Sequence, residues 1–350
     1  MKRVVVINPL LSGQATGMGL AAEGLGAVLP PGSRQPAPRL DRWFCRVNRL
    51  RPAFLRQVFR LALAQIAPWF TRREDFLLFS SHHAPLWRTG RHAVILYDLI
   101  ALHFPSQSRT QTLYYRFVLP RVVRCATRVV TISDTVRAEL AGQFPGTAAA
   151  QATVIPAYVS RLGRPAPAGV SLAERRRRGV LAFVGARYRH KNLSFALAAL
   201  KQAPGAGLSL VVAGCRRELW PELGRLEAAG RARTLGYADD AALDELYGTS
   251  LALLYPSLAE GQGLPPLEAM AAGCPVICAD IPVLHETCGD AAFYVDPRDP
   301  AALAGLLAGL QSGAADAEIE QRIAAGRRRV EAFRQPALAA RWRAFLEGMA

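Results

Sequence analysis

Short apolar runs of strand length alternate with helical stretches along most of the chain. In the second half, the runs that we expect as strands are 180–185, 208–214, 234–237, 251–256, 275–280 and 292–296. In the first half they are 2–8, 76–80, 93–97 and 154–156, and 128–140 fits a strand, a cap and a helix. Continuous apolar strands separated by helices are typical of parallel sheets with both faces covered. The pattern predicts an α/β protein with doubly wound parallel sheets, which bind ligands beyond the carboxyl ends of their strands.

The length of the chain and one change in composition predict two domains. With 350 residues, the chain can form two cores of ordinary size. Residues 161–179 are rich in Pro, Gly and Arg and are expected as a linker. We therefore expect a Rossmann-like domain over 1–160, a second over 180–320, and C-terminal helices over 321–350.

The stretch 41–70 is basic and amphipathic. Pro52 divides it into two helical pieces, and the preceding 30–38, with four prolines, is expected as a loop. Its only acid is Asp41, and its arginines are Arg42, Arg46, Arg49, Arg51, Arg56 and Arg60. Such a helix fits an anionic bilayer surface, or equally the outside of an α/β domain. Both interpretations stay open.

The formal net charge is +16 and is carried by the first half. Residues 1–170 hold 22 Lys and Arg against 7 acids, while residues 171–350 hold 21 against 20. A field of this kind attracts an anionic partner such as a lipid surface, nucleic acid or a phosphorylated substrate. A composition bias toward arginine is the alternative, but it would not favour one half of the chain.

Cysteine usage and hydropathy indicate a cytoplasmic protein. The six cysteines form no C-x-x-C pair and are expected to be reduced. No apolar run reaches the roughly 18 residues of a membrane span, and the N-terminus is too short and strand-like for a signal peptide. The basic first half leaves open a peripheral contact with the inner face of the cytoplasmic membrane.

A glycine-rich loop in the second half predicts an anion site. Gly261 and Gly263 follow a strand-like run, and Pro265 stands where a helix can begin without losing a hydrogen bond. Such a helix start offers free N–H groups and the positive end of its dipole to an anion. Glu260 and Glu268 flank this point, and carboxylates accept hydrogen bonds from sugar hydroxyls. The combination suggests a nucleotide sugar, although similar turns are often only structural.

The segment YPSLAEGQGLPPLEAMAAGCPV, residues 255–276, closely resembles the signature of family 4 retaining glycosyltransferases, which have the GT-B fold. That signature carries two glutamates separated by seven residues, and the block 289–297 resembles the next block of the family. The resemblance implies two Rossmann-like domains that face a cleft, with the last helix crossing back to the first domain. It also implies that Glu260 contacts the transferred sugar and Glu268 the ribose. It places the donor against Gly261, Gln262, Gly263 and Leu264.

A second match is the segment FVGARYRHKNL, residues 183–193. The family uses an Arg and a Lys here to hold the donor diphosphate, which implies this role for Arg187 and Lys191 and places Gly185 at the donor. Charged hydrogen bonds are each worth roughly 1.5–3 kcal/mol. Arg189 and His190 are alternates, since the whole loop is basic. By the same resemblance, Gly236 and Tyr237 contact the nucleotide base.

In the first half, the candidate residues follow the expected strands. Tyr97-Asp98-Leu99 resembles a His-Asp-Leu motif of the family, so Asp98 is a catalytic candidate, while Tyr97 replaces a histidine and its role stays open. Ser133 matches a serine near the cleft and, like its neighbour Asp134, can cap a helix. Residues 17–22 fit G-x-G-x-x-A, a loose dinucleotide fingerprint. The resemblance instead places Gly17 and Gly19 near the bound donor or acceptor.

These observations predict a retaining hexosyltransferase that uses a GDP-mannose-like or UDP-sugar donor. Its acceptor would be a glycan or a lipid-diphosphate-linked glycan of a cell-envelope polysaccharide. The catalytic candidates are Glu260, Arg187, Lys191 and Asp98. We expect no cofactor, no nucleic-acid partner and no metal, because the sequence has no Asp-x-Asp and the cations and helix end would take the place of a metal. The alternatives are an NAD-dependent oxidoreductase or epimerase and a sugar-binding module without turnover.

Overall fold

The computed structural model describes residues 3–9, 24–29, 34–35, 38–50, 53–164, 169–203 and 207–348. The chain forms two compact units. Unit 1 comprises Met1–Gly163 and Phe333–Ala350, and unit 2 comprises Arg164–Ala332. Each unit contains one six-stranded sheet, and every strand pair in both sheets is parallel. The prediction of two doubly wound parallel sheets is confirmed.

The sheet of unit 1 has the order β2-β1-β3-β4-β5-β6. Its strands are β1 (Val4–Ile7), β2 (Arg34–Gln35), β3 (Phe76–Phe79), β4 (His92–Leu96), β5 (Arg128–Thr131) and β6 (Thr153–Val154). The strands β1, β3 and β4 are buried along their whole length, as expected for strands covered on both faces. The order reverses between β1 and β3, so the crevice of this sheet lies at the carboxyl ends of these two strands.

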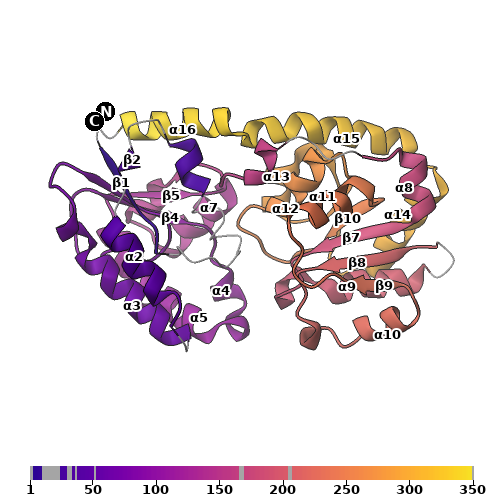
Figure 1. Cartoon of the computed structure of the whole chain (residues 1–350), viewed down its shortest axis with the longest axis horizontal. Helices are drawn as coiled ribbons and strands as arrows, with labels where there is room; N and C mark the ends of the chain where they lie inside the picture. The colour runs from indigo at the N-terminus through magenta and orange to yellow at the C-terminus, as the bar shows by residue number, and fades with distance from the viewer. Residues whose placement is uncertain are drawn as a thin grey trace. The chain divides into compact units, whose positions relative to one another are not determined.

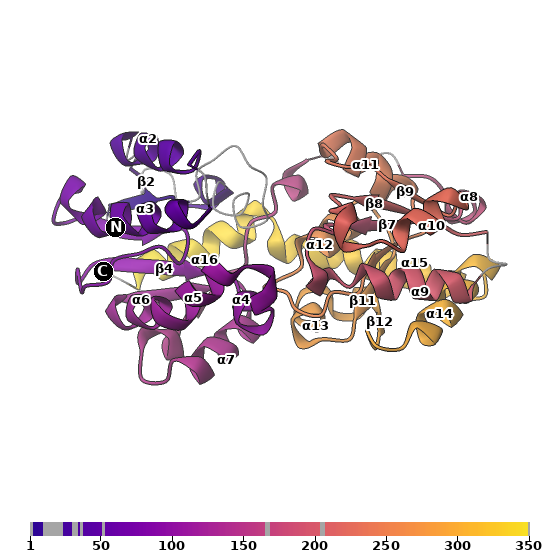
Figure 2. The same ribbon diagram turned by 90° about the horizontal axis from the view of Figure 1, so that it is seen from below.

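Helices cover both faces of this sheet. They are α2 (Pro38–Val47), α3 (Ala53–Ile66), α4 (Ile100–His103), α5 (Arg109–Phe117), α6 (Leu119–Cys125), α7 (Asp134–Gln143) and α16 (Gln335–Glu347). Figures 1 and 2 show α2, α3 and α5 on one face and α16 on the other. Buried side chains of α2, α6 and α7, such as Phe44, Val122 and Leu140, pack with Val5, Phe79 and other residues of the sheet into one core. Helix α16 is tied to this unit by a hydrogen bond of 2.7 Å from Gln335 Nε2 to the carbonyl oxygen of Ala27.

The sheet of unit 2 has the order β12-β11-β10-β7-β8-β9. Its strands are β7 (Val180–Val184), β8 (Ser209–Ala213), β9 (Ala232–Thr234), β10 (Ala252–Tyr255), β11 (Val276–Ala279) and β12 (Ala292–Val295). If β7 is counted as the first strand of this unit, the order read from β9 to β12 is 3-2-1-4-5-6, which is that of the Rossmann fold. The point where the order reverses lies between β7 and β10.

The helices of unit 2 are α8 (Leu172–Arg178), α9 (Leu193–Gln202), α10 (Leu223–Ala228), α11 (Asp240–Thr249), α12 (Leu264–Ala271), α13 (Pro282–Cys288), α14 (Pro300–Ser312) and α15 (Asp316–Val330). Figure 1 shows α9 and α10 on one side of β7 and β8, and α11 and α12 on the other. Side chains of α9 and α14, including Leu197 and Leu307, share one core with strand residues such as Phe183, Leu210 and Leu254.

Three local expectations differ from the structure. The proline-rich stretch 30–38 was expected as a loop, but it contains β2, and α2 begins at Pro38. A two-residue strand has no alternation to detect, and its existence depends on pairing with β1. Helix α8 lies within 161–179, the expected linker. The strand expected over 234–237 is β9, which ends at Thr234, so that Gly236 and Tyr237 follow it.

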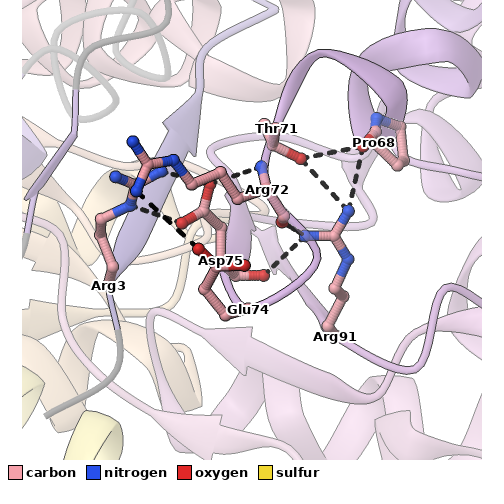
Figure 3. Close-up of polar contacts among 7 residues, drawn as sticks. All are labelled: Arg3, Pro68, Thr71, Arg72, Glu74, Asp75 and Arg91. Carbon is pink, nitrogen blue, oxygen red and sulfur yellow. Dashed lines mark hydrogen bonds and ion pairs between the residues drawn. The ribbon is translucent and has the colours of Figure 1, made fainter.

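A polar network joins the amino ends of β1, β3 and β4 in unit 1 (Figure 3). Arg3 donates to both oxygens of the buried Asp75 carboxylate, at 2.5 and 2.9 Å. The hydrogen bond from Arg3 is the main reason why the pKa of Asp75 lies below its usual value. Arg91 donates to the carbonyl oxygens of Pro68, Arg72 and Asp75. These charges therefore hold strand ends together at the edge opposite the crevice.

Candidate functional site

The crevice of unit 2 collects most of the sequence candidates. Gly185 follows β7, and the loop 256–263 follows β10, so both lie at the carboxyl ends of the two strands between which the order reverses. In open α/β sheets this is the place where ligands bind. The sheet topology thus brings the loops 185–192 and 256–263 together, although they are far apart in the sequence.

An ion pair links these two loops. Lys191 Nζ lies 2.5 Å from Glu260 Oε1, and it also donates to the Tyr255 hydroxyl at 2.9 Å. The exposed fractions of the two charged side chains are only 15% and 9%. The Lys191 ammonium lies 4.9 Å from the centre of the Tyr255 ring, a distance at which the ring stabilises a cation. The candidate sugar-binding carboxylate and a candidate diphosphate-binding cation are therefore direct neighbours.

The environment of Glu260 keeps its carboxylate ionised. Burial is the largest influence and by itself raises the pKa of Glu260. The charge of Lys191 and hydrogen bonds from Lys191, Ser257 and Tyr255 outweigh burial, so the pKa lies below the ordinary value. The pKa of the neighbouring His190 is lowered to about 4, first by burial and then by Lys191. His190 is thus neutral at neutral pH, and Lys191 is the cation that faces Glu260.

The loop after β7 depends on glycine. Gly185 has φ +88°, a conformation that favours glycine, and a Cβ at this position would lie 3.8 Å from Lys191 Cε. Its amide donates to the carbonyl oxygen of Ala213 at 2.9 Å. Arg187 follows with an exposed side chain that makes no salt bridge to any residue in the described ranges. Lys191 is therefore already paired, whereas Arg187 has its side chain exposed to solvent.

The loop after β10 leads into α12 through Gly263. This residue has φ +100°, which requires glycine, and a Cβ would also crowd the Leu284 side chain, with Cδ2 at 2.9 Å. The first three helical positions are Leu264, Pro265 and Pro266. Since proline has no N–H, the helix end offers fewer donors than an ordinary N-terminus. An anion here would be bound by the amide of Leu264 and those of the preceding loop.

Glu268 lies on α12, and its position is set by a tyrosine from another helix. The Tyr247 hydroxyl on α11 donates to Glu268 Oε2 at 3.2 Å. Tyr247 is fully buried, and its carbonyl oxygen accepts a hydrogen bond of 2.9 Å from the buried Arg175 of α8. Glu268 itself is half-buried. Its carboxylate, on α12, is thus held by Tyr247, and its assignment to the ribose stays a prediction.

Gly236 and Tyr237 lie in the turn after β9. The Gly214 amide, which follows β8, donates to the carbonyl oxygen of Gly236 at 2.6 Å. The Tyr237 side chain is 77% exposed. Their assignment to the nucleotide base stays a prediction.

The unit 1 candidates lie at the carboxyl edge of its own sheet. Tyr97 directly follows β4 and is buried, and burial raises its pKa far above the ordinary value. The Asp98 carboxylate accepts from the Ile100 amide at 3.0 Å. Ser133 caps α7 by accepting from the Val136 amide at 3.2 Å, which confirms the expected cap. Residues 17 and 19 fall outside the described ranges.

A second polar group, whose histidines the sequence suggested to be structural, lies at this edge. The Ser80 hydroxyl donates to Asn8 Oδ1 at 2.9 Å across the reversal between β1 and β3. The next residues include His82 and His83, which are buried against Tyr114 and Tyr115. Burial, followed by the charge of Arg60, lowers the pKa of His82 to about 3. The sequence showed these histidines without any motif around them, so only their burial at the crevice makes them notable.

Two tyrosines that position the candidates were also not predicted as site residues. Tyr255 ends a strand and was visible only as part of the signature. Tyr247 belongs to the ordinary apolar face of α11 and gave no signal.

Over the described ranges, no group of three His, Cys, Asp or Glu side chains could hold a metal ion. Nor does any helix in that part of the chain combine the length and apolar character needed to cross a membrane.

Comparison with known proteins finds a matching family model and named relatives. Residues 170–327, nearly all of unit 2, match the family model of glycosyl transferases group 1. The chain is 29% identical to the O-antigen chain mannosyltransferase RfbU of Salmonella typhimurium over 73% of this chain and 69% of that protein. It is 28% identical to the O-antigen chain mannosyltransferase B of Escherichia coli over 75% of this chain and 72% of that protein.

Solved structures agree on the fold. Anabaena HepE in complex with UDP-glucose matches with a TM-score of 0.69 and 16% identity, covering 99% of this chain and 100% of that one. Sucrose-phosphate synthase from Thermosynechococcus elongatus matches with a TM-score of 0.71 and 18% identity, covering 99% of each chain. The comparisons confirm an enzyme of the hexosyltransferase class. This chain is a glycosyltransferase of the GT-B fold whose unit 2 matches the family model of glycosyl transferases group 1, and it is similar in sequence to two O-antigen chain mannosyltransferases.

Proposed function

We propose that this glycosyltransferase belongs to family 4 and transfers a hexose, with retention of anomeric configuration, from a nucleotide-diphosphate sugar. The relatives named as O-antigen chain mannosyltransferases favour mannose and a GDP-mannose-like donor, with a UDP-sugar as the alternative. The acceptor is a glycan or lipid-diphosphate-linked glycan in cell-envelope polysaccharide synthesis. The observation that carries the proposal is the ion pair of Lys191 and Glu260 at the crevice of unit 2.

Each candidate has a chemical role in this reaction. The departing nucleoside diphosphate gains negative charge, which Arg187, Lys191 and the Leu264 amide would stabilise. Lys191 would then be shared between the diphosphate and Glu260, whose carboxylate accepts hydrogen bonds from the transferred sugar. Glu268 would bind the ribose hydroxyls. Asp98, in unit 1, would contribute from the acceptor side.

We also propose that the reaction needs no metal and no organic cofactor. The two basic side chains and the helix end supply the positive charge that a divalent ion supplies in other glycosyl transfers. The enzyme should therefore keep its full rate in excess EDTA. A rate that falls with EDTA and returns with Mg²⁺ or Mn²⁺ would contradict this part of the proposal.

The donor is tested with the purified chain and a panel of nucleotide sugars. A ligand present at 100 times its Kd stabilises the folded state by about 2.7 kcal/mol, so the correct donor should raise the thermal unfolding temperature. GDP-mannose is expected to give the largest shift, and release of GDP should accompany transfer. Proton NMR of the product should show an α-linked sugar from an α-linked donor. A β-linked product, or shifts with NAD alone, would overturn the proposal.

We further propose that the enzyme acts in the cytoplasm, at the inner face of the cytoplasmic membrane, and that 41–70 contacts the lipid. Six arginines and a single acid in this stretch support an anionic surface as partner. The test is sedimentation with phosphatidylglycerol vesicles at low and high salt. Binding should be strong at low salt and weaken as salt rises, because surface charges are then screened. Equal sedimentation with neutral vesicles, or none with either, would refute the contact.

A further inference from the structure

The first half of helix α3 turns large apolar side chains outward. Phe54, Leu55, Val58 and Phe59 are all exposed, and the Trp69 and Phe70 side chains that follow the helix are 75% and 45% exposed. These are six of the twelve large apolar side chains that are exposed in the described part of the chain. An outer helix of an α/β domain normally places such residues on its sheet. A contiguous apolar surface of this kind marks an interaction site.

The inward side of α3 carries polar side chains beside the buried Ala64, and their hydrogen bonds hold the helix in this orientation. Gln57 is hydrogen-bonded to the buried His83, and Arg60 Nε donates to Asn48 Oδ1 at 2.6 Å. Gln65 accepts from the Leu86 amide at 2.8 Å. These partners belong to unit 1 itself, so the helix is held with Gln57, Arg60 and Gln65 inward. The exposed apolar face is therefore a property of the fold and not of a loosely attached helix.

A groove runs between α2 and α3, which lie side by side in Figure 2. Its volume is about 340 Å³, which falls within the roughly 300–1,000 Å³ typical of small-molecule sites. Its lining residues are Trp43, Val47, Phe59, Ala62, Leu63 and Ile66, together with Arg46. Trp43 also packs edge-to-face on Phe70, with ring centres 5.2 Å apart. The groove is thus apolar and continuous with the exposed surface.

Cations flank this groove on the α2 side. Three arginines here are exposed: Arg42, Arg46 and Arg49. Arg42 and Arg46 lie four residues apart on one face of α2, and Arg49 follows just after the helix end. Asp41 is the only acid between residues 38 and 70. An apolar groove bordered by guanidinium groups is complementary to a molecule with a hydrocarbon chain and a phosphate.

We propose that the groove between α2 and α3 binds one acyl chain of an anionic phospholipid, while the α2 arginines contact its phosphate. The inference deepens the membrane contact proposed above and rests on it. A surface contact alone would leave Trp43 at headgroup depth, whereas a bound chain places acyl carbons directly against its ring. A second copy of this chain is disfavoured, because an isologous dimer would bring the same arginines together.

The test is tryptophan quenching by phosphatidylglycerol vesicles that carry bromine on their acyl chains. The Trp43 contribution is the difference between the wild-type chain and Trp43→Phe, measured with brominated and unbrominated lipid. Ala62→Leu narrows the groove, and Ala308→Leu makes the same change on an exposed position of α14 in unit 2 as a matched control. We expect Ala62→Leu to reduce the Trp43 quenching several-fold, with vesicle sedimentation largely kept. Ala308→Leu should change neither, and thermal unfolding checks that all variants fold.

Each other outcome is decisive. Sedimentation without Trp43 quenching would refute the bound chain but leave the membrane contact intact, whereas no sedimentation would refute both. Equal Trp43 quenching in brominated phosphatidylcholine would refute the role of the arginines. A lipid-free dimer that Ala62→Leu dissociates, seen by light scattering, would show that a second copy occupies the groove. An acidic amphipathic peptide is the last competitor. If it binds the chain without vesicles and also abolishes the Trp43 quenching by lipid, the groove would be assigned to a protein partner.

Discussion

Lys191 Nζ and Glu260 Oε1 lie 2.5 Å apart although 69 positions separate the two residues in the sequence. One residue follows β7 and the other follows β10, and these strands are neighbours at the point where the sheet order reverses. The pair is largely buried, so its members depend on each other for charge compensation. Both the chemistry and the stability of the crevice should therefore respond to changes at either position.

Glu260→Gln should lower the transfer rate by at least about 100-fold, because removing a preorganised electrostatic partner of the reacting group costs this much in other enzymes. The fold should survive, since glutamine keeps the shape and an oxygen for Lys191. Initial rates with saturating donor and acceptor measure the effect, and thermal unfolding checks the fold. Glu320→Gln, on an exposed position of α15, is the control and should keep the wild-type rate.

Lys191→Met should destabilise unit 2 by about 3–5 kcal/mol at neutral pH, because it leaves a buried carboxylate without its cation. Adding Glu260→Gln to this variant should restore much of the loss, since no charge then remains unpaired. Urea unfolding of the two single variants and the double variant gives the coupling free energy. Additive losses would show that the two side chains do not compensate each other.

Arg187→Ala should weaken the binding of the nucleoside diphosphate by about 10- to 150-fold, which corresponds to a charged hydrogen bond of roughly 1.5–3 kcal/mol. Its side chain is exposed, so the stability of the free protein should hardly change. Titration calorimetry with GDP and UDP measures the Kd. Arg189→Ala, two residues along the same basic loop, is the matched control. If Arg189→Ala caused the loss and Arg187→Ala did not, the diphosphate role would move to Arg189.

Gly263→Ala should destabilise the protein and reduce donor binding. Its φ of +100° is unfavourable for alanine, and the new methyl group would meet Leu284 Cδ2 at 2.9 Å. We expect backbone strain and crowding to lower the free energy of unfolding by about 1–3 kcal/mol. Gly305→Ala on α14, where nothing lies within 4 Å of the added Cβ, should instead stabilise the helix by about 0.5–1 kcal/mol. Chemical denaturation of both variants tests the contrast, and equal effects would contradict it.

His92 should make the stability of unit 1 depend on pH. Burial lowers its pKa to about 4, so the folded state binds a proton less readily than the unfolded chain, whose histidine has a pKa near 6.5. Its stabilising contribution is therefore complete above about pH 6.5 and is lost as the pH falls toward 4, by up to roughly 3 kcal/mol. Comparing the wild-type chain with His92→Gln across this range isolates the effect. The difference in unfolding free energy should change with pH, and a constant difference would contradict the assignment.

The sequence predicted elements that depend on local physics. Apolar runs predicted every strand of the two sheets except β2 to within a few residues, Pro52 lies between α2 and α3 in the sequence, and Ser133 caps α7. The glycine loop before α12 was also readable, because a positive φ at Gly263 is a local requirement. Each of these features is set by neighbours in the chain, so the residues themselves carry the information.

Tertiary structure decided what depends on distant partners. Strand β2 exists because it pairs with β1. The exposure of Phe54, Leu55, Val58 and Phe59 on α3 follows from inward contacts of the helix, which include Gln57 with His83 and Arg60 with Asn48. No periodicity could distinguish that face from a buried one, since both have the same spacing. The order of strands alone brings Lys191 to Glu260. The sequence by itself determined which residues could bind a nucleotide sugar, and the sheet topology determined which of them meet, because contacts between distant segments follow from the packing of the whole sheet.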